Sequence, residues 1–239
     1  MTEKQYGGAT GRRAENKSMK PDKISIKNSE QISASKANSK DSPLRQGGEL
    51  EIQPQKISYQ EKIIKAGKIA SEVRENIKSI IKKDMLLLKI AEKIEDKIIE
   101  LGGKPAFPVN LSINEIAAHY TPSYDDKTLA HGLLKVDFGV HIDGWCSDQS
   151  FSIDLENSDE NKKLIQASKD ALKKAIELIS KKIEKKEILR TGEIGETIQK
   201  TIESQGFLPI INLSGHQIEQ NNLHAGLTIP NINNKSTEI

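Results

Sequence analysis

Two aspartates, Asp137 and Asp148, stand on the two arms of a predicted β-hairpin. The dipeptide Asp143-Gly144 is a strong signal for the turn between the arms, because a two-residue type I′ turn needs positive φ at both positions. With that turn Asp137 lies opposite Ser150, so the two aspartates are diagonal neighbours on one face, roughly 7–8 Å apart at Cα. Two carboxylates at that separation can hold metal ions about 3.5–4 Å apart.

The first arm of this hairpin alternates between apolar and other residues. Its apolar positions are Val136, Phe138, Val140 and Ile142. This period of two predicts that these side chains face the core and that Asp137 faces a cleft. Ser147 and Gln149 break the alternation on the return arm.

Two histidines of a type that binds metal ions, His216 and His224, follow later in the chain. Together with the aspartates they suggest a two-metal hydrolase. Each residue also has an ordinary interpretation, since an aspartate near a hairpin is often a turn or edge residue and the eight-residue spacing of the histidines is a weak metal motif. His119 follows residues 114–118, which could form a short helix, and a lone histidine there is more often a surface residue.

Composition restricts the function only modestly. The chain has 36 Lys and Arg against 34 Asp and Glu, and a net charge of +2 gives no reason to expect nucleic acid or a membrane as the main partner. Its single cysteine, Cys146, excludes an internal disulfide framework and is better explained as a strand residue than as a nucleophile.

The chain divides into a polar N-terminal part and one folded domain. Residues 1–56 are poor in aromatic and branched apolar residues and rich in Lys, Ser, Asn, Gly and Gln, so we expect a disordered extension, whose basic character could contact RNA or a ribosome. Residues 57–239 are enough for one domain. No secretion signal and no apolar run of about 20 residues is visible, which predicts a cytoplasmic protein without a membrane partner.

The predicted domain nearly repeats itself. The segment Ile90–Gly102 is echoed by Ile194–Gly206, and the helical pattern before each also corresponds. Each unit therefore reads as helix, helix, strand, with Gly102 and Gly206 ending the second helices and Ser158 starting the helix that runs to about Lys182. The second unit should also contain a hairpin, but residues 229–239 are too polar for the strands that the repeat requires.

Several long motifs resemble type 2 methionine aminopeptidases of the archaeal kind. They are Gly103–Pro122, the Asp137–Asp148 hairpin, Asn212–Glu219 and Leu223–Gly226, and the likeness extends from about Ile63 to Asn231. The resemblance implies an α+β pita-bread fold, as in creatinase and the aminopeptidases, with two related halves around a dinuclear metal site. In this chain the second half is incomplete. The activity implied is removal of the initiator methionine from nascent polypeptides whose second residue is small.

The resemblance also implies a role for individual residues. It implies three metal ligands, which are Asp137, Asp148 and His216. It implies two histidines that contact the substrate and steady the tetrahedral intermediate, His119 and His224, and two residues that line the methionine pocket, Phe107 and Leu223. The cofactor would be two divalent ions, and Co, Mn, Fe and Zn all accept such ligands.

The chain departs from this family in its downstream part. A complete enzyme of this kind has two further glutamate ligands, and neither Glu219 nor Glu238 sits in a matching motif. The chain could be a fragment of an aminopeptidase, one half of a split enzyme that receives a second chain on unpaired strand edges near residues 208–230, or a non-catalytic protein- or RNA-binding module. The three ligand-type residues and two substrate-type histidines favour the enzyme, although we expect these 239 residues alone to be inactive.

Overall fold

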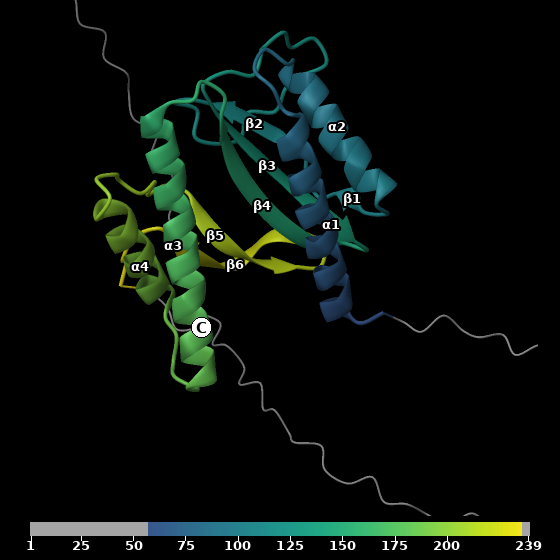
Figure 1. Ribbon diagram of the computed structural model, residues 1–239. Coiled ribbons are helices and arrows are strands. Elements are labelled where there is room, and N and C mark those ends of the chain that lie inside the picture. The colour runs from purple at the N-terminus through teal and green to yellow at the C-terminus, as the bar shows by residue number, and fades with distance from the viewer. Residues whose placement is uncertain (1–56, 236–239) are drawn as a thin grey trace, which may run out of the picture. The chain divides into compact units, whose positions relative to one another are not determined.

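The computed structural model describes residues 57–235 (Figure 1). The extension predicted for residues 1–56 and the residue Glu238 lie outside this range. The described helices are α1 (Tyr59–Ile80), α2 (Leu87–Glu100), α3 (Asp159–Glu184) and α4 (Thr191–Glu203). The strands are β1 (Lys104–Pro105), β2 (Asn110–Ile113), β3 (Leu133–Ile142), β4 (Trp145–Asp154), β5 (Ser214–Glu219) and β6 (Asn222–Pro230).

α1 begins, and α2 ends, where local chemistry favours it. The Ser58 hydroxyl accepts a hydrogen bond from the N–H of Glu61, and the Glu61 carboxylate accepts one from the N–H of Ser58, so two free donors at the start of α1 are satisfied. Gly102 has a φ of +80° just after α2, which confirms the predicted stop.

The predicted hairpin is confirmed in both turn and register. Asp143 and Gly144 have φ values of 50° and 81°, and β3 and β4 pair with Asp137 opposite Ser150. The aspartates Asp137 and Asp148 therefore project from the same face of the hairpin. On the other edge of β3, β1 and β2 pair with successive parts of the strand, so β3 is the centre of an antiparallel sheet.

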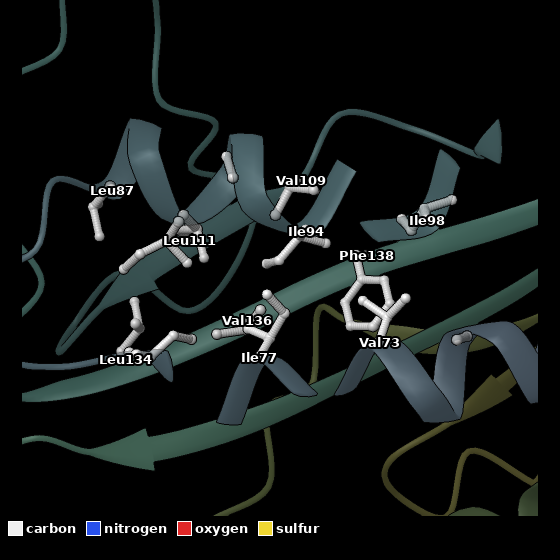
Figure 2. Packing of buried hydrophobic residues seen from close by; sticks show 14 of the residues in the cluster. Val73, Ile77, Leu87, Ile94, Ile98, Val109, Leu111, Leu134, Val136 and Phe138 are labelled. Carbon is white, nitrogen blue, oxygen red and sulfur yellow. The ribbon is translucent and has the colours of Figure 1, made fainter. Parts of the chain in front are cut away.

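The main core lies between this sheet and the helices α1 and α2. Figure 2 shows Leu134, Val136 and Phe138 of β3 among the buried side chains of the two helices. The predicted alternation holds, because Val136, Phe138 and Val140 are fully buried whereas Asp137 is half-buried on the opposite face. The apolar face of β3 thus anchors the strand, and its polar face is left for the site.

The second unit repeats the order helix, helix, strand, as predicted. The Ser158 hydroxyl accepts from the N–H of Asn161 at the start of α3, and Gly206 after α4 has a φ of +84°. In Figure 1, α3 and α4 lie beside each other on the side of the molecule where β5 and β6 run.

The end of the second unit differs from expectation. β5 and β6 form an antiparallel pair, so the second unit does contain a hairpin, and among the described strands no other strand pairs with its outer edges. Asn221 has a φ of +57° at the connection, and asparagine adopts this left-handed conformation more readily than most residues. Half-buried Leu223, Leu227 and Ile229 alternate along β6 and give the strand one face to pack.

Candidate metal centre

The hairpin β3–β4 places two carboxylates side by side. Asp148 pairs with Gly139, two residues beyond Asp137 on the same face of β3. The Asp148 side chain is 25% exposed and Asp137 is half-buried. Because the opposite face of β3 packs into the core, both carboxylates are held on a rigid element.

The second hairpin brings an imidazole to these carboxylates. Nε2 of His216 on β5 lies 3.1 Å from Oδ2 of Asp148, and the His216 side chain is 15% exposed. The ring of His224 on β6 packs edge-on against His216, with ring centroids 4.3 Å apart. His216 thus meets Asp148, and His224 meets His216, although both helices of the second unit, α3 and α4, separate the hairpins along the chain.

His119 completes this group of side chains from a loop. Its charge is among those that act on Asp137, so the two side chains are close enough to interact. The expectation of a short helix before His119 is wrong, because residues 114–118 form a turn and then irregular chain. His119 itself has a φ of +66°, a conformation that costs energy for a residue with a Cβ and often marks a functional site.

The electrostatics at Asp137 reflect its burial and the second carboxylate nearby. Burial raises the pKa of Asp137 above its usual range, and the negative charge of Asp148 adds to this effect. A hydrogen bond from Asn110 and the nearby His119 and His216 oppose the rise. A positive ion at this position would remove the repulsion between the two carboxylates.

The ring of Phe107 lies over the strand position that faces Asp148. A Cβ added at Gly139 would stand 2.6 Å from Cε1 of Phe107, so only glycine leaves room for the ring there. Leu223 is half-buried on β6, next to His224 in sequence. Phe107 therefore lies beside Gly139, the strand partner of Asp148, and Leu223 precedes His224 on β6.

Cys146 does not take part in this chemistry. Its side chain is buried, and burial raises the pKa of its thiol, with a further contribution from Asp148. A thiol with a raised pKa is a poor nucleophile, which agrees with its interpretation as a strand residue.

One polar residue of this site, Asn110, is absent from the sequence-based set. It pairs with Asp137 across the β2–β3 ladder, and its Nδ2 donates to Oδ2 of Asp137 at 3.3 Å. Asn110 lies within the motif Gly103–Pro122, which is the sequence signal that could have identified it. The motif alone, however, does not reveal that the strand with Asn110 pairs with β3.

The tips of the two hairpins are joined, which fixes His216 relative to Asp148. The N–H of Asn221 donates to the carbonyl of Gly144 at 2.9 Å, and the Gln220 side chain donates to the carbonyl of Asp143 at the same distance. On the other side, Lys62 of α1 lies 2.7 Å from the Asp143 carboxylate. We call Lys62, Asp143, Gly144, Gln220 and Asn221 the hairpin clasp.

The donor atoms fit a divalent metal ion in type. Carboxylate oxygens and imidazole nitrogens suit first-row divalent ions, and Nδ1 of His216 is buried without a hydrogen-bond partner. In residues 57–235 no group of three or more such side chains has the arrangement that holds a metal ion, and Asp148 and His216 contact each other directly. Glu219 is exposed and accepts a hydrogen bond from Gln217, so it does not join the group.

Comparison with known proteins shows the family of the chain. Residues 61–239 match the model of metallopeptidase family M24. The methionine aminopeptidase of Thermococcus onnurineus (strain NA1) is 51% identical over 176 residues, which are 72% of this chain and 56% of that protein. That of Methanothermus fervidus is 44% identical over 190 residues, 74% of this chain and 98% of that protein. The chain spans about half the length of the relatives from Thermococcus onnurineus and Pyrococcus abyssi, at 56% of each.

Solved structures show the same fold. A methionine aminopeptidase from Thermotoga maritima superposes with a TM-score of 0.65 at 27% identity, covering 76% of this chain and 74% of that chain. An X-Pro aminopeptidase from Thermotoga maritima MSB8 reaches a TM-score of 0.57 at 20% identity, over 72% and 48%. Among the described helices none is both long and apolar enough to cross a membrane. With its pita-bread fold, the match over residues 61–239 and these relatives, the chain belongs to metallopeptidase family M24.

Proposed function

We propose that this chain carries the metal-binding and substrate-binding part of a methionine aminopeptidase. The observation that supports this most is the meeting of Asp148 and His216, which come from different hairpins, beside Asp137 and His224. The reaction would remove the initiator methionine from polypeptides with a small second residue. A binding module would not need these four side chains to meet.

Asp137, Asp148 and His216 would hold two divalent metal ions, and Co, Mn, Fe and Zn all accept such donors. When bound, the ions polarise the peptide carbonyl and lower the pKa of a bound water from near 16 to roughly 7. The two aspartates supply negative charge, and the core packing of the other face of β3 holds Asp137 in place. The folding of the chain therefore offsets the repulsion between the two carboxylates before a metal ion binds.

His119 and His224 would contact the substrate. Both are exposed, so a peptide can reach them, whereas His216 is largely covered. An imidazole N–H can donate to the oxygen of the scissile peptide group and stabilise the negative charge that develops there, an effect worth about 10²-fold or more in rate. The left-handed backbone of His119 fixes the direction of its side chain.

Phe107 and Leu223 would hold the methionine side chain. Phe107 lies beside Gly139, the strand partner of Asp148, and a thioether packs favourably against an aromatic ring. An apolar wall next to the site binds the side chain of the first residue and leaves its peptide group facing Asp137 and Asp148.

The two further glutamate ligands implied by the resemblance would come from polypeptide beyond these 239 residues, either in the same product or as a second chain. We propose that the 239-residue chain alone releases little or no methionine for this reason. The partners would be nascent N-termini in the cytoplasm, and residues 1–56, which are basic and rich in serine, would approach the ribosome.

The test is methionine release by tagged protein recovered from its source organism with any polypeptide that stays bound. We expect release from a Met-Ala-Ser peptide in the presence of Co²⁺ or Mn²⁺, little from Met-Lys-Ser, and none after Asp148→Asn, because that variant loses one ligand charge. Release that survives Asp148→Asn would contradict the proposal.

A further inference from the structure

Asn110 makes two hydrogen bonds that link different parts of the site. Its side-chain Nδ2 donates to Oδ2 of Asp137 at 3.3 Å, and its Oδ1 accepts from the hydroxyl of Thr121 at 2.6 Å. Thr121 lies two residues after His119 in the loop that follows β2. The amide therefore connects a proposed metal ligand to the loop that carries a proposed substrate-binding histidine.

The direction of these bonds is set by the chemistry of the three groups. An ionised carboxylate can only accept, so the NH₂ of Asn110 must face Asp137 and its carbonyl oxygen must face Thr121. The Thr121 hydroxyl must then donate, although a hydroxyl can do either. Thr121 thus holds the amide in the one orientation that donates to Asp137.

The backbone around this pair is fixed from both sides. Asn110 is opposite Asp137 in the β2–β3 ladder, which sets the separation of the two side chains. The loop returns to β2, because the N–H of Leu111 donates to the carbonyl of Tyr120 at 2.7 Å. The Tyr120 hydroxyl in turn donates to Asp126 at 2.7 Å. The side chains of Asn110 and Thr121 therefore meet with little freedom.

We propose that Asn110 and Thr121 are positioning residues, which orient the Asp137 carboxylate for the metal and hold the His119 loop beside it. This inference rests on the proposed function, since it concerns the same site. Hydrogen-bonding partners of metal ligands commonly change metal affinity by 10–100-fold when they are removed.

The experiment is a titration of the 239-residue chain with Co²⁺, followed by the visible absorption of the bound ion and by calorimetry. We expect Asn110→Ala and Thr121→Val each to raise the Kd by about tenfold and to shift the absorption band, because the carboxylate is no longer held. Thr121→Ser keeps the hydroxyl and should restore the affinity and the band of the wild type.

A matched control is Thr201→Val, which removes a hydroxyl that donates to the carbonyl of Thr197 in α4, far from this site in sequence. It should leave both readouts unchanged, and thermal melting of each variant reports loss of fold separately. Wild-type affinity and spectrum in folded Asn110→Ala and Thr121→Val would overturn the positioning role. A wild-type chain that binds no Co²⁺ would overturn the metal-ligand role of Asp137 and with it the positioning role, whereas failure of the protein recovered with its bound polypeptide to release methionine would separately overturn the proposed function.

Discussion

Asp137 is the residue whose environment conflicts most with its charge. It is half-buried on β3 and faces Asp148, and both facts raise its pKa. A carboxyl group with a raised native pKa binds its proton more tightly in the folded than in the unfolded chain. Stability from this group is therefore complete below the unfolded pKa of about 3.9 and is lost as the pH rises through the native pKa.

We predict that Asp137→Asn stabilises the metal-free chain at pH 7, because the neutral amide avoids the buried charge. The melting temperature measured with a chelator should rise by a few degrees, given about 2–4 °C per kcal/mol for a domain of this size. The gain should shrink towards pH 3, where the wild-type carboxyl is protonated too.

Asp96→Asn on the exposed side of α2 serves as the control, with no such pH-dependent gain. An Asp137→Asn variant whose gain is the same at pH 3 and pH 7 would show that charge is not the cause.

The sequence predicted the positions of the two aspartates but not the residue that hydrogen-bonds to Asp137. The diagonal placement of Asp137 and Asp148 follows from one turn, because pairing in a hairpin is local. His216 and His224 were singled out by residue type, but the role of each came from the resemblance, since their spacing is a weak metal motif. Asn110 could not be found, because its partner lies 27 residues away and is chosen by the pairing of β2 with β3.

At the level of the elements, the hairpin clasp holds the β5–β6 hairpin against the β3–β4 hairpin. The turn residue Gly144 has a φ of +81°, and a Cβ there would stand 2.1 Å from Oδ1 of Asn221, so the Asn221 side chain would have to move. The backbone hydrogen bond between Asn221 and Gly144 needs this close approach.

We predict that Gly144→Ala lowers the free energy of unfolding by about 1–3 kcal/mol through strain and collision. It should also weaken Co²⁺ binding, because it separates His216 from Asp148. Denaturant unfolding and metal titration measure the two effects. Adding Asn221→Gly to this variant removes the collision and should recover part of the free energy of unfolding and part of the Co²⁺ affinity.

The matched control for this change is Gly67→Ala in the middle of α1, where a Cβ would meet nothing within 4 Å. Alanine there should stabilise the chain by up to about 1 kcal/mol. An equal change in the free energy of unfolding in Gly144→Ala and Gly67→Ala, or unchanged Co²⁺ affinity in Gly144→Ala, would show that the clasp does not position the site.

Helices were easier to predict than the later strands. Ser58, Ser158, Gly102 and Gly206 lie at helix ends for reasons of local hydrogen bonding and backbone conformation, and the helical sections of the repeat follow. The pair β5–β6 was not predicted, because its turn depends on the left-handed conformation of Asn221 and on contact with another hairpin.

Across the described molecule, the two related halves bury their apolar side chains to different extents. The main core cluster comes from α1, α2, β2, β3 and the loop around Ala130. In contrast, α3 buries small side chains only, Ala167, Ala171 and Ala175, and leaves Leu172, Ile176 and Ile183 exposed. Fewer apolar contacts mean a lower free energy for local opening.

We predict that backbone amides of α3 exchange with deuterium faster than those of α1, by about tenfold or more after correction for intrinsic rates, equivalent to ~1.4 kcal/mol in opening free energy. Hydrogen exchange with mass spectrometry measures this on the full chain. Equal protection of the two helices would contradict the inequality inferred from burial.

The central claim is that Asp137, Asp148 and His216 form a metal centre. The most direct measurement is diffraction from crystals of the chain grown with Co²⁺, recorded at the cobalt absorption edge. We expect an anomalous peak at bonding distance, about 2.0–2.2 Å, from the Asp137 and Asp148 carboxylates and the His216 ring. The absence of a peak there, or cobalt bound only by other residues, would contradict it.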